Sequence, residues 1–97
     1  MRFIQTMEIK TSRWDEMMAL EQEWLAATEG ARTLVRETHG RDRDRPGTYV
    51  IIAEFDSYED AMKNNELPAT QQIADRMAKL ADGEVVFRNL DVLDENA

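Results

Sequence analysis

The sequence predicts an α+β protein built on a four-stranded antiparallel β-sheet, with its elements in the order βαββαβ. Three observations lead to this class. Four segments have the alternation or the β-branched content of strands, segments with helical periodicity follow the first and third of them, and a charged, glycine-bounded loop joins the two halves. A length of 97 residues, with no internal linker or low-complexity tract, suits one domain spanning residues 1–97.

The first half begins with a strand over Phe3–Ile9, where a mostly apolar face alternates with a mixed one. Ser12 offers a side-chain oxygen that could cap a following helix, and acidic residues follow it in the first turn. From Trp14 onward apolar residues recur at steps of three and four, which predicts one buried helix face, and Gly30 is placed to end the helix. The apolar positions are Met17, Met18, Leu20, Trp24, Leu25 and Ala27, and Glu16, Glu21 and Glu23 fall toward the opposite face.

A hairpin with a long tip connects the two halves. Thr33–His39 alternates as a second strand, and Thr48–Phe55 is a third. The third strand is almost continuously apolar and rich in β-branched residues, which favours a central position in the sheet with both faces covered. The loop between them, Gly40–Gly47, is charged, and its Pro46-Gly47 pair suits a type II turn.

The second half contains two helices and the last strand. Ser57 opens a capping box with an acidic residue at its third helical position, and a short helix is expected through Asn65. Pro68 suits the first turn of a further helix. Glu84–Leu93 is the last strand, and residues 94–97 form a polar tail.

Two strand–helix–strand halves joined by a hairpin describe the ferredoxin-like arrangement, with the helices on one face of the sheet. The third and fourth strands carry apolar side chains on both faces, which is more than one layer of helices can cover. At about 25 cal/mol per Å², leaving ~300 Å² of such surface in water would forfeit several kcal/mol, which is comparable with the stability of a small domain. We therefore expect a homodimer in which two copies stack their sheet faces.

Composition and charge exclude several classes of protein. The formal net charge of −8, with no basic stripe to offset it, disfavours nucleic-acid binding because it repels phosphate backbones. The chain has no cysteine and one histidine, so we expect no disulfide, no cysteine nucleophile and no metal site. No apolar run reaches the roughly 20 residues of a membrane span, and the first residues do not resemble a signal peptide. We expect no membrane association and a location in the cytoplasm.

A block of motifs runs from Tyr49 to Leu80. It contains a hydrophobic strand ending in Glu-Phe-Asp, the capped segment Ser57–Met62, the pair Asn64-Asn65 and the helix that starts at Pro68. This block resembles the dimeric α+β barrel superfamily, and within it the antibiotic-biosynthesis-monooxygenase-like (ABM-like) domains. The resemblance implies a pocket between sheet and helices in each subunit. It also implies oxidation or rearrangement of polycyclic or quinol-like molecules, often without metal or flavin.

Haem-degrading relatives place a histidine near the end of the short helix, where it binds iron. The resemblance puts Asn65 at this position, or Asn64 if the alignment shifts by one residue. A carboxamide is a poor iron ligand but a good hydrogen-bond partner for a carbonyl or hydroxyl of a ligand. We therefore expect no haem and no other cofactor.

The candidate pocket residues are polar groups within apolar strands and bulky groups on the expected helices. Burying an unpaired polar group costs roughly 1–3 kcal/mol, so such groups must be paired, lie at the dimer seam, face solvent at an edge or line a wet pocket. We predict substrate binding by Gln5, Trp24, Tyr49, Met62, Asn65 and Asn89. Each has a structural alternative, since pairing satisfies amides and methionine and aromatic residues also fill cores.

His39 is the only histidine, and Glu37 shares its strand face and could orient it. Because both lie near the tip of an exposed hairpin, a solvated or ordinarily hydrogen-bonded histidine is the simpler expectation. No nucleophilic triad, phosphate-binding loop or dinucleotide fingerprint is present, so no catalytic residue is assigned.

Two functions fit these observations. The first is a small-molecule-binding barrel that acts as a cofactor-independent monooxygenase or cyclase on an aromatic or polyketide-like substrate. A tyrosine hydroxyl and a carboxamide would then orient a phenol or enolate while dioxygen reacts. The second is a non-catalytic dimeric protein with a ligand-binding or accessory role.

Overall fold

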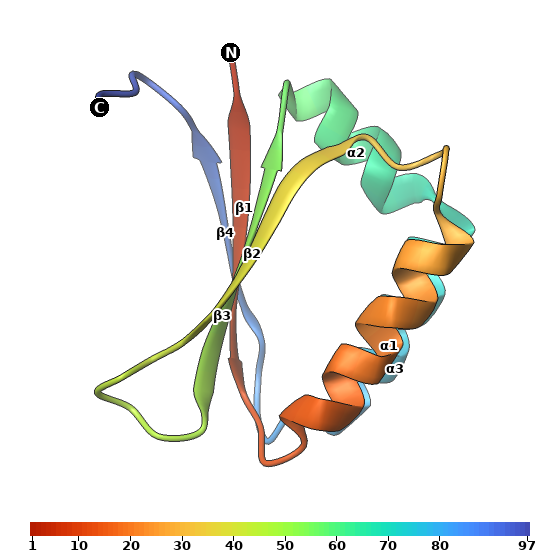
Figure 1. Ribbon diagram of the computed structural model, residues 1–97, viewed down its shortest axis with the longest axis vertical. Coiled ribbons are helices and arrows are strands. Elements are labelled where there is room, and N and C mark those ends of the chain that lie inside the picture. The colour runs from red at the N-terminus through yellow and green to blue at the C-terminus, as the bar shows by residue number, and fades with distance from the viewer.

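The computed structural model describes residues 1–97 and has the predicted ferredoxin-like α+β fold. Its sheet has the strand order β2-β3-β1-β4, and all three neighbouring pairs are antiparallel. Three helices lie on one side of this sheet, as Figure 1 shows. The elements are β1 (Phe3–Lys10), α1 (Trp14–Ala27), β2 (Leu34–Arg41), β3 (Thr48–Phe55), α2 (Tyr58–Glu66), α3 (Pro68–Leu80) and β4 (Val86–Asp91).

Strand β3 is central, as its composition predicted, and its two faces have different surroundings. Ile51, Ala53 and Phe55 alternate along the helix-facing side and are at most 4% exposed. Val50 and Ile52 point to the other side and are only half-buried. No helix covers that other side (Figure 1), so the surplus of apolar surface inferred from the sequence is present on the folded chain.

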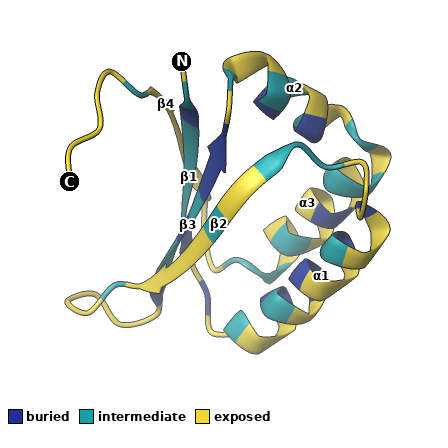
Figure 2. Ribbon diagram, turned by 45° about the horizontal axis from the view of Figure 1, so that its top comes forward, coloured by how far each residue is buried: buried dark blue, intermediate teal, exposed yellow.

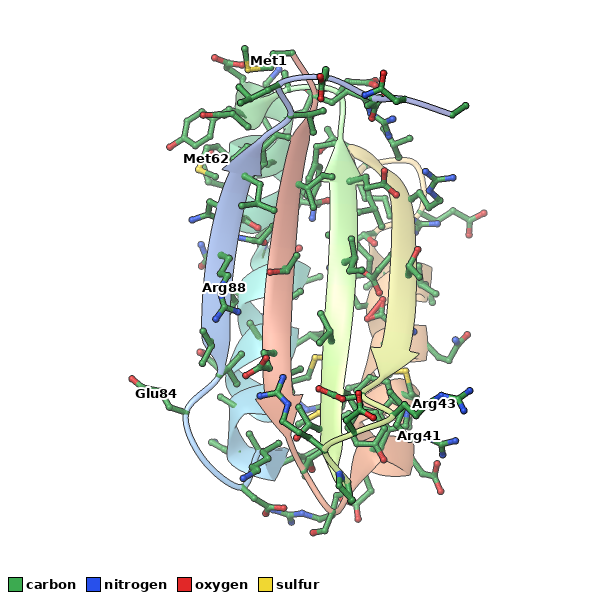
Figure 3. All side chains as sticks on the ribbon, turned by 90° about the vertical axis from the view of Figure 1, so that its left-hand side faces the viewer. Met1, Arg41, Arg43, Met62, Glu84 and Arg88 are labelled. Atoms are coloured by element: carbon green, nitrogen blue, oxygen red, sulfur yellow. The ribbon has the colours of Figure 1, made fainter.

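We call this side the outer face of the sheet, and Figure 3 looks onto it, with Arg88 on β4 among its side chains. Its apolar members include two exposed residues of β4, Val86 (38%) and Leu90 (46%). One buried charge interrupts it: Glu54 is 8% exposed and accepts hydrogen bonds from Arg36 (2.6 Å) and Arg2 (3.1 Å). The outer face is formed by Ile4, Thr6, Glu8, Arg36, Thr38, Val50, Ile52, Glu54, Val86, Arg88 and Leu90.

Strand β2 contains a β-bulge that its sequence did not predict. Leu34 lies opposite Phe55 and Arg36 lies opposite Glu54, so Val35 is an extra residue in the ladder. The expected uniform alternation over Thr33–His39 is therefore wrong. After the bulge, the strand turns Glu37 and His39 to the helix-facing side, which Leu34 also faces.

The start of α1 differs from the prediction. Arg13 rather than Ser12 occupies the cap position, and no side chain there caps the helix. Instead, Thr11 Oγ1 accepts a hydrogen bond from the Arg13 backbone N–H (3.0 Å), and Asp82 accepts one from the Ser12 N–H (2.7 Å). The helix then ends at Ala27, before Gly30, whose positive φ of 80° shapes the following turn.

The turn and capping signals elsewhere are confirmed. Ser57 Oγ accepts from the Asp60 backbone N–H at 3.1 Å, and Pro68 opens α3. Gly47 has φ +79°, and the Thr48 N–H bonds to the carbonyl three residues before it, as a type II turn requires. The last strand is shorter than expected and β2 runs two residues further into the loop.

The buried residues gather on β1, on β3 and on the sheet-facing sides of the helices, while β2 and β4 are mostly exposed (Figure 2). The core forms three clusters rather than one. The first contains Phe3, Ala53, Phe55 and Ala61, the second Ile9, Met17 and Ile51, and the third Leu20, Trp24 and Ile73. None of the three helices has the length and apolar character needed to cross a membrane.

Candidate functional site

A cavity of about 570 Å³ lies between the helix-facing side of the sheet and the helices. Met7, Ile51 and Phe55 contribute to its floor, and Trp24 and Met77 to its roof. Of its 23 lining residues 14 are hydrophobic, which is the usual character of a site for a small organic molecule.

Trp24 is fixed in the roof by contacts on both sides of its ring. Its indole Nε1 donates a hydrogen bond of 2.8 Å to Thr70 Oγ1, which ties α1 to α3. The Arg32 guanidinium lies 5.8 Å from the ring centroid, within the range of a cation–π contact. The side chain is only 6% exposed, so its orientation toward the cavity is determined by packing.

The polar part of the cavity wall is a pair of carboxyl groups. Glu21 comes from α1 and Glu37 from β2. Glu21 is 6% exposed, although its position predicted the solvent side of the helix, so that expectation is wrong. Behind the pair, His39 Nε2 lies 2.5 Å from Glu37 Oε1, which places the imidazole between the cavity wall and the surface.

The surroundings of Glu21 change its acidity. Burial raises the pKa of Glu21 to about 8, with further contributions from a hydrogen bond to Glu37 and from the charge of that carboxylate. The nearby positive groups, His39 and Arg32, act in the opposite direction and do not outweigh burial. At neutral pH Glu21 is therefore protonated and donates a hydrogen bond to Glu37.

Glu21, Glu37 and His39 also form the one cluster that could hold a divalent metal ion, because their ligand atoms all lie within 4.8 Å of one another. In the structure hydrogen bonds join these atoms, so a metal would have to displace the shared proton. The expectation of no metal site rested on the absence of cysteine, on the single histidine and on the spacing of acidic residues along the chain. Such spacing does not reveal residues that α1 and β2 bring together.

Three of the six predicted binding residues line the cavity: Gln5, Trp24 and Asn65. Asn89 lies beside it, where its Oδ1 accepts a hydrogen bond of 3.1 Å from Gln5 Nε2 across β1 and β4. The two amides are therefore paired with each other, which is the structural alternative to substrate binding that the sequence left open. Substrate binding by these residues stays a prediction.

The other two predicted residues lie away from the lining. Met62 packs against the cluster of Phe3 and Phe55. Tyr49 stacks on Trp14, with ring centroids 4.2 Å apart and planes within 3°, near the hairpin end of the molecule. The tyrosine hydroxyl is therefore not brought together with the carboxamides in the cavity.

Both carboxamides of α2, Asn64 and Asn65, line the cavity, but only Asn64 has a buried oxygen without a hydrogen-bond partner. Asn64 is 5% exposed, and the unpartnered atom is its Oδ1. The sequence does contain a signal for it, since Asn64 follows the buried Ala61 by three residues and so shares its helix face. A similar signal exists for Glu21, which follows Met17 by four residues and precedes Trp24 by three.

Comparison with known proteins identifies solved structures of the same fold but no protein of similar sequence. No family model and no curated protein sequence matches the chain. Among solved structures, a candidate antibiotic biosynthesis monooxygenase from Caulobacter crescentus is similar with a TM-score of 0.82 and 12% identity, covering 96% of this chain and 91% of that one. Rv0793 from Mycobacterium tuberculosis is similar with a TM-score of 0.81 and 14% identity over the whole of both chains.

A third similar structure is SnoaB, a cofactor-independent oxygenase from Streptomyces nogalater. Its TM-score is 0.81 at 16% identity, and the match covers 97% of this chain and 95% of that one. At these identities the likeness concerns the fold. The resemblance read from the motifs is confirmed at that level: the chain shares its fold with solved structures that include a candidate antibiotic biosynthesis monooxygenase and SnoaB.

Proposed function

We propose that this chain, with its ABM-like fold, binds a small aromatic molecule in the cavity and acts on it as a cofactor-independent monooxygenase. The observation that carries the proposal is the cavity itself. It is about 570 Å³ and mostly apolar, and its few polar lining residues include the Glu21–Glu37 pair and Asn64. Such a wall suits an apolar ring system held in one orientation by a few hydrogen bonds.

The chemistry would consist of orientation and one proton transfer. Glu37 accepts the proton of a phenol or enol, with Glu21 and His39 as its hydrogen-bond partners. The electron-rich anion then reacts with dioxygen, the second substrate. One oxygen atom stays in the product, and the other leaves as water with two hydrogen atoms taken from the substrate. A dihydroxyaromatic compound thus becomes a hydroxyquinone, and all four electrons that reduce dioxygen come from the substrate. SnoaB supports this reading, since a protein of the same fold is described as a cofactor-independent oxygenase.

The proposed assembly is a homodimer formed through the outer face of the sheet. The half-buried Val50 and Ile52 and the exposed Val86 and Leu90 give this face its apolar character. Covering it with the same face of a second copy removes that area from water. The internal pairing of Glu54 with Arg36 and Arg2 supports this arrangement, because it avoids placing an uncompensated charge in the seam.

Oxygen consumption with a panel of dihydroxyaromatic compounds tests the proposed activity, and tryptophan fluorescence follows binding in parallel. Uptake of oxygen together with quenching is the expected result. Glu37→Gln should abolish uptake while retaining quenching, whereas the exposed Glu16→Gln should change neither. If no compound both quenches and consumes oxygen, the monooxygenase proposal is wrong.

A second function is favoured by one observation. Glu37 is already hydrogen-bonded to both Glu21 and His39, which also suits a passive binding wall. The chain would then be a non-catalytic dimeric ligand-binding or accessory protein. Quenching by dihydroxyaromatic compounds without oxygen uptake would identify this case.

A further inference from the structure

The charged groups in the cavity wall all have the same sign. Glu21, Glu37 and Glu84 are the only ionisable lining residues, and no lysine, arginine or histidine is among them. Arg32 and His39 act on Glu21 from outside the lining. A ligand that enters the cavity therefore meets acidic groups and no positive partner, so a negatively charged ligand would be repelled.

An uncharged polar side chain of the lining, Asn64, places a second requirement on the ligand. Asn64 Oδ1 is a buried hydrogen-bond acceptor with no partner in the protein, and leaving such an atom unsatisfied is costly. Asn64 lines the cavity, and a rotation of its carboxamide would bring this oxygen to a hydrogen-bond donor on the ligand. Asn64 comes from α2, whereas the acidic pair comes from α1 and β2, so the two observations are independent.

We infer that the cavity selects an apolar ligand whose polar groups are hydrogen-bond donors and that it excludes carboxylates and other anions. The inference rests on the proposed function for the cavity and deepens it by naming the ligand's chemistry. Two kinds of donor share this chemistry, a hydroxyl and a protonated amine. The lining brings two carboxyl groups together from α1 and β2 and contains no positive group, so the amine is the better match of the two.

Four naphthalene derivatives with the same ring system separate these possibilities: naphthylmethylamine, naphthalenemethanol, methylnaphthalene and naphthylacetate. Their affinities are measured by isothermal titration calorimetry at neutral pH. A charge-assisted hydrogen bond is worth about 1.5–3 kcal/mol, so the amine should bind at least about tenfold more tightly than methylnaphthalene. The alcohol should lie between these two, and naphthylacetate should bind most weakly.

Variants connect this order to the residues that cause it. Glu37→Gln should lower the affinity for the amine toward that for the alcohol, without weakening methylnaphthalene. Glu21→Gln replaces a carboxyl group that is already protonated at neutral pH, so it should largely keep the preference for the amine. Asn64→Leu, which keeps the volume and removes the acceptor, should remove the advantage of the alcohol over methylnaphthalene. The exposed Glu16→Gln is the matched control and should leave all four affinities unchanged. Circular dichroism verifies folding, and the order of the four affinities in the parent chain still tests the inference if Glu37→Gln fails to fold.

The outcomes distinguish this inference from the proposed function. If all four compounds bind equally, or naphthylacetate binds best, the cavity still binds aromatic molecules and only the donor inference is overturned. If none of them binds, both the donor inference and aromatic binding are overturned. If the parent chain shows the predicted order of affinities and the Glu37→Gln and Asn64→Leu variants lose it, both the donor inference and aromatic binding are supported.

Discussion

The indole N–H of Trp24 donates a hydrogen bond of 2.8 Å to Thr70 Oγ1, joining α1 and α3 above the cavity. Both residues line the cavity, so this bond belongs to its roof. Because the indole is 6% exposed, little water is available to replace a lost partner.

Thr70→Val should therefore destabilise the fold while preserving the shape of the side chain. The loss is expected to be about 1–3 kcal/mol, the cost of leaving a buried donor unsatisfied. Urea unfolding followed by circular dichroism measures it. A change of less than a few tenths of a kcal/mol would show that the roof does not depend on this bond.

The two tryptophans should report differently on the cavity. Trp24 lines it, whereas Trp14 stacks on Tyr49 outside the lining. Naphthylmethylamine should quench the emission of Trp14→Phe, which retains Trp24, and should leave the emission of Trp24→Phe almost unchanged. The opposite pattern would place the ligand beside the hairpin instead.

Glu21 should make stability depend on pH. Its pKa rises from 4.5 to about 8 on folding, so between these values the folded chain binds more protons at this residue than the unfolded chain. The stabilising effect of the protonated form is fully present below pH 4.5 and is lost as pH rises through 8. This residue's contribution to the free energy of unfolding should fall by up to about 1.4 kcal/mol per pH unit in that window.

Glu21→Gln cannot lose that proton, so its stability should exceed that of the parent chain above pH 8 and approach it near pH 4.5. Urea unfolding across this pH range provides the comparison, with Glu16→Gln as the exposed control on the same helix. Parallel stability curves for Glu21→Gln and the parent chain would contradict the shifted pKa.

A charge in the middle of the outer face should prevent the proposed dimer. Ile52 lies on the central strand β3, so Ile52→Lys places two ammonium groups in the seam of a symmetric pair. Light scattering should give a dimer mass for the parent chain and a folded monomer for Ile52→Lys. Leu93→Lys, at a residue 89% exposed beyond β4, should remain dimeric. A monomeric parent chain would disprove sheet stacking.

Gly47 should tolerate a methyl group less well than Gly40. Gly47 has φ +79°, a conformation that costs other residues roughly 1 kcal/mol, and Gly40 has no positive φ. Added Cβ atoms would have similar room at the two positions, since the nearest atom is 3.9 Å away in each case. Thermal unfolding should therefore show a lower Tm for Gly47→Ala than for Gly40→Ala. Equal values would mean that the turn changes its conformation.

The order of the elements could be predicted from the sequence because it depends on local patterns. Alternation predicted the strands, Ser57 and Pro68 marked the starts of α2 and α3, and the apolar content of Thr48–Phe55 predicted a central strand. The start of α1 was not predicted, because Ser12 is a good cap by type. Its N–H is instead bonded by Asp82, a residue distant in the sequence.

The candidate site was harder to predict because its polar residues meet through the fold. A glutamate on an amphipathic helix is normally solvated, so Glu21 was assigned to the exposed side. Its burial depends on Glu37, which a different element brings next to it. Tyr49 was expected in the pocket from its strand face, but the stacked Trp14 occupies that end of the sheet.

Val35, the extra residue in β2, has a consequence for how this site could have arisen. Because one inserted residue reverses the alternation of side chains across it, a chain that lacked Val35 and kept the pairing of Leu34 with Phe55 would direct Glu37 and His39 away from the helices. Gain or loss of a single codon at this edge strand would thus add Glu37 to the cavity wall or remove it, while Glu21 and Glu84 stay in place. Comparing the length of this strand among proteins of the same fold would therefore separate chains that could carry the acidic pair from chains that could not.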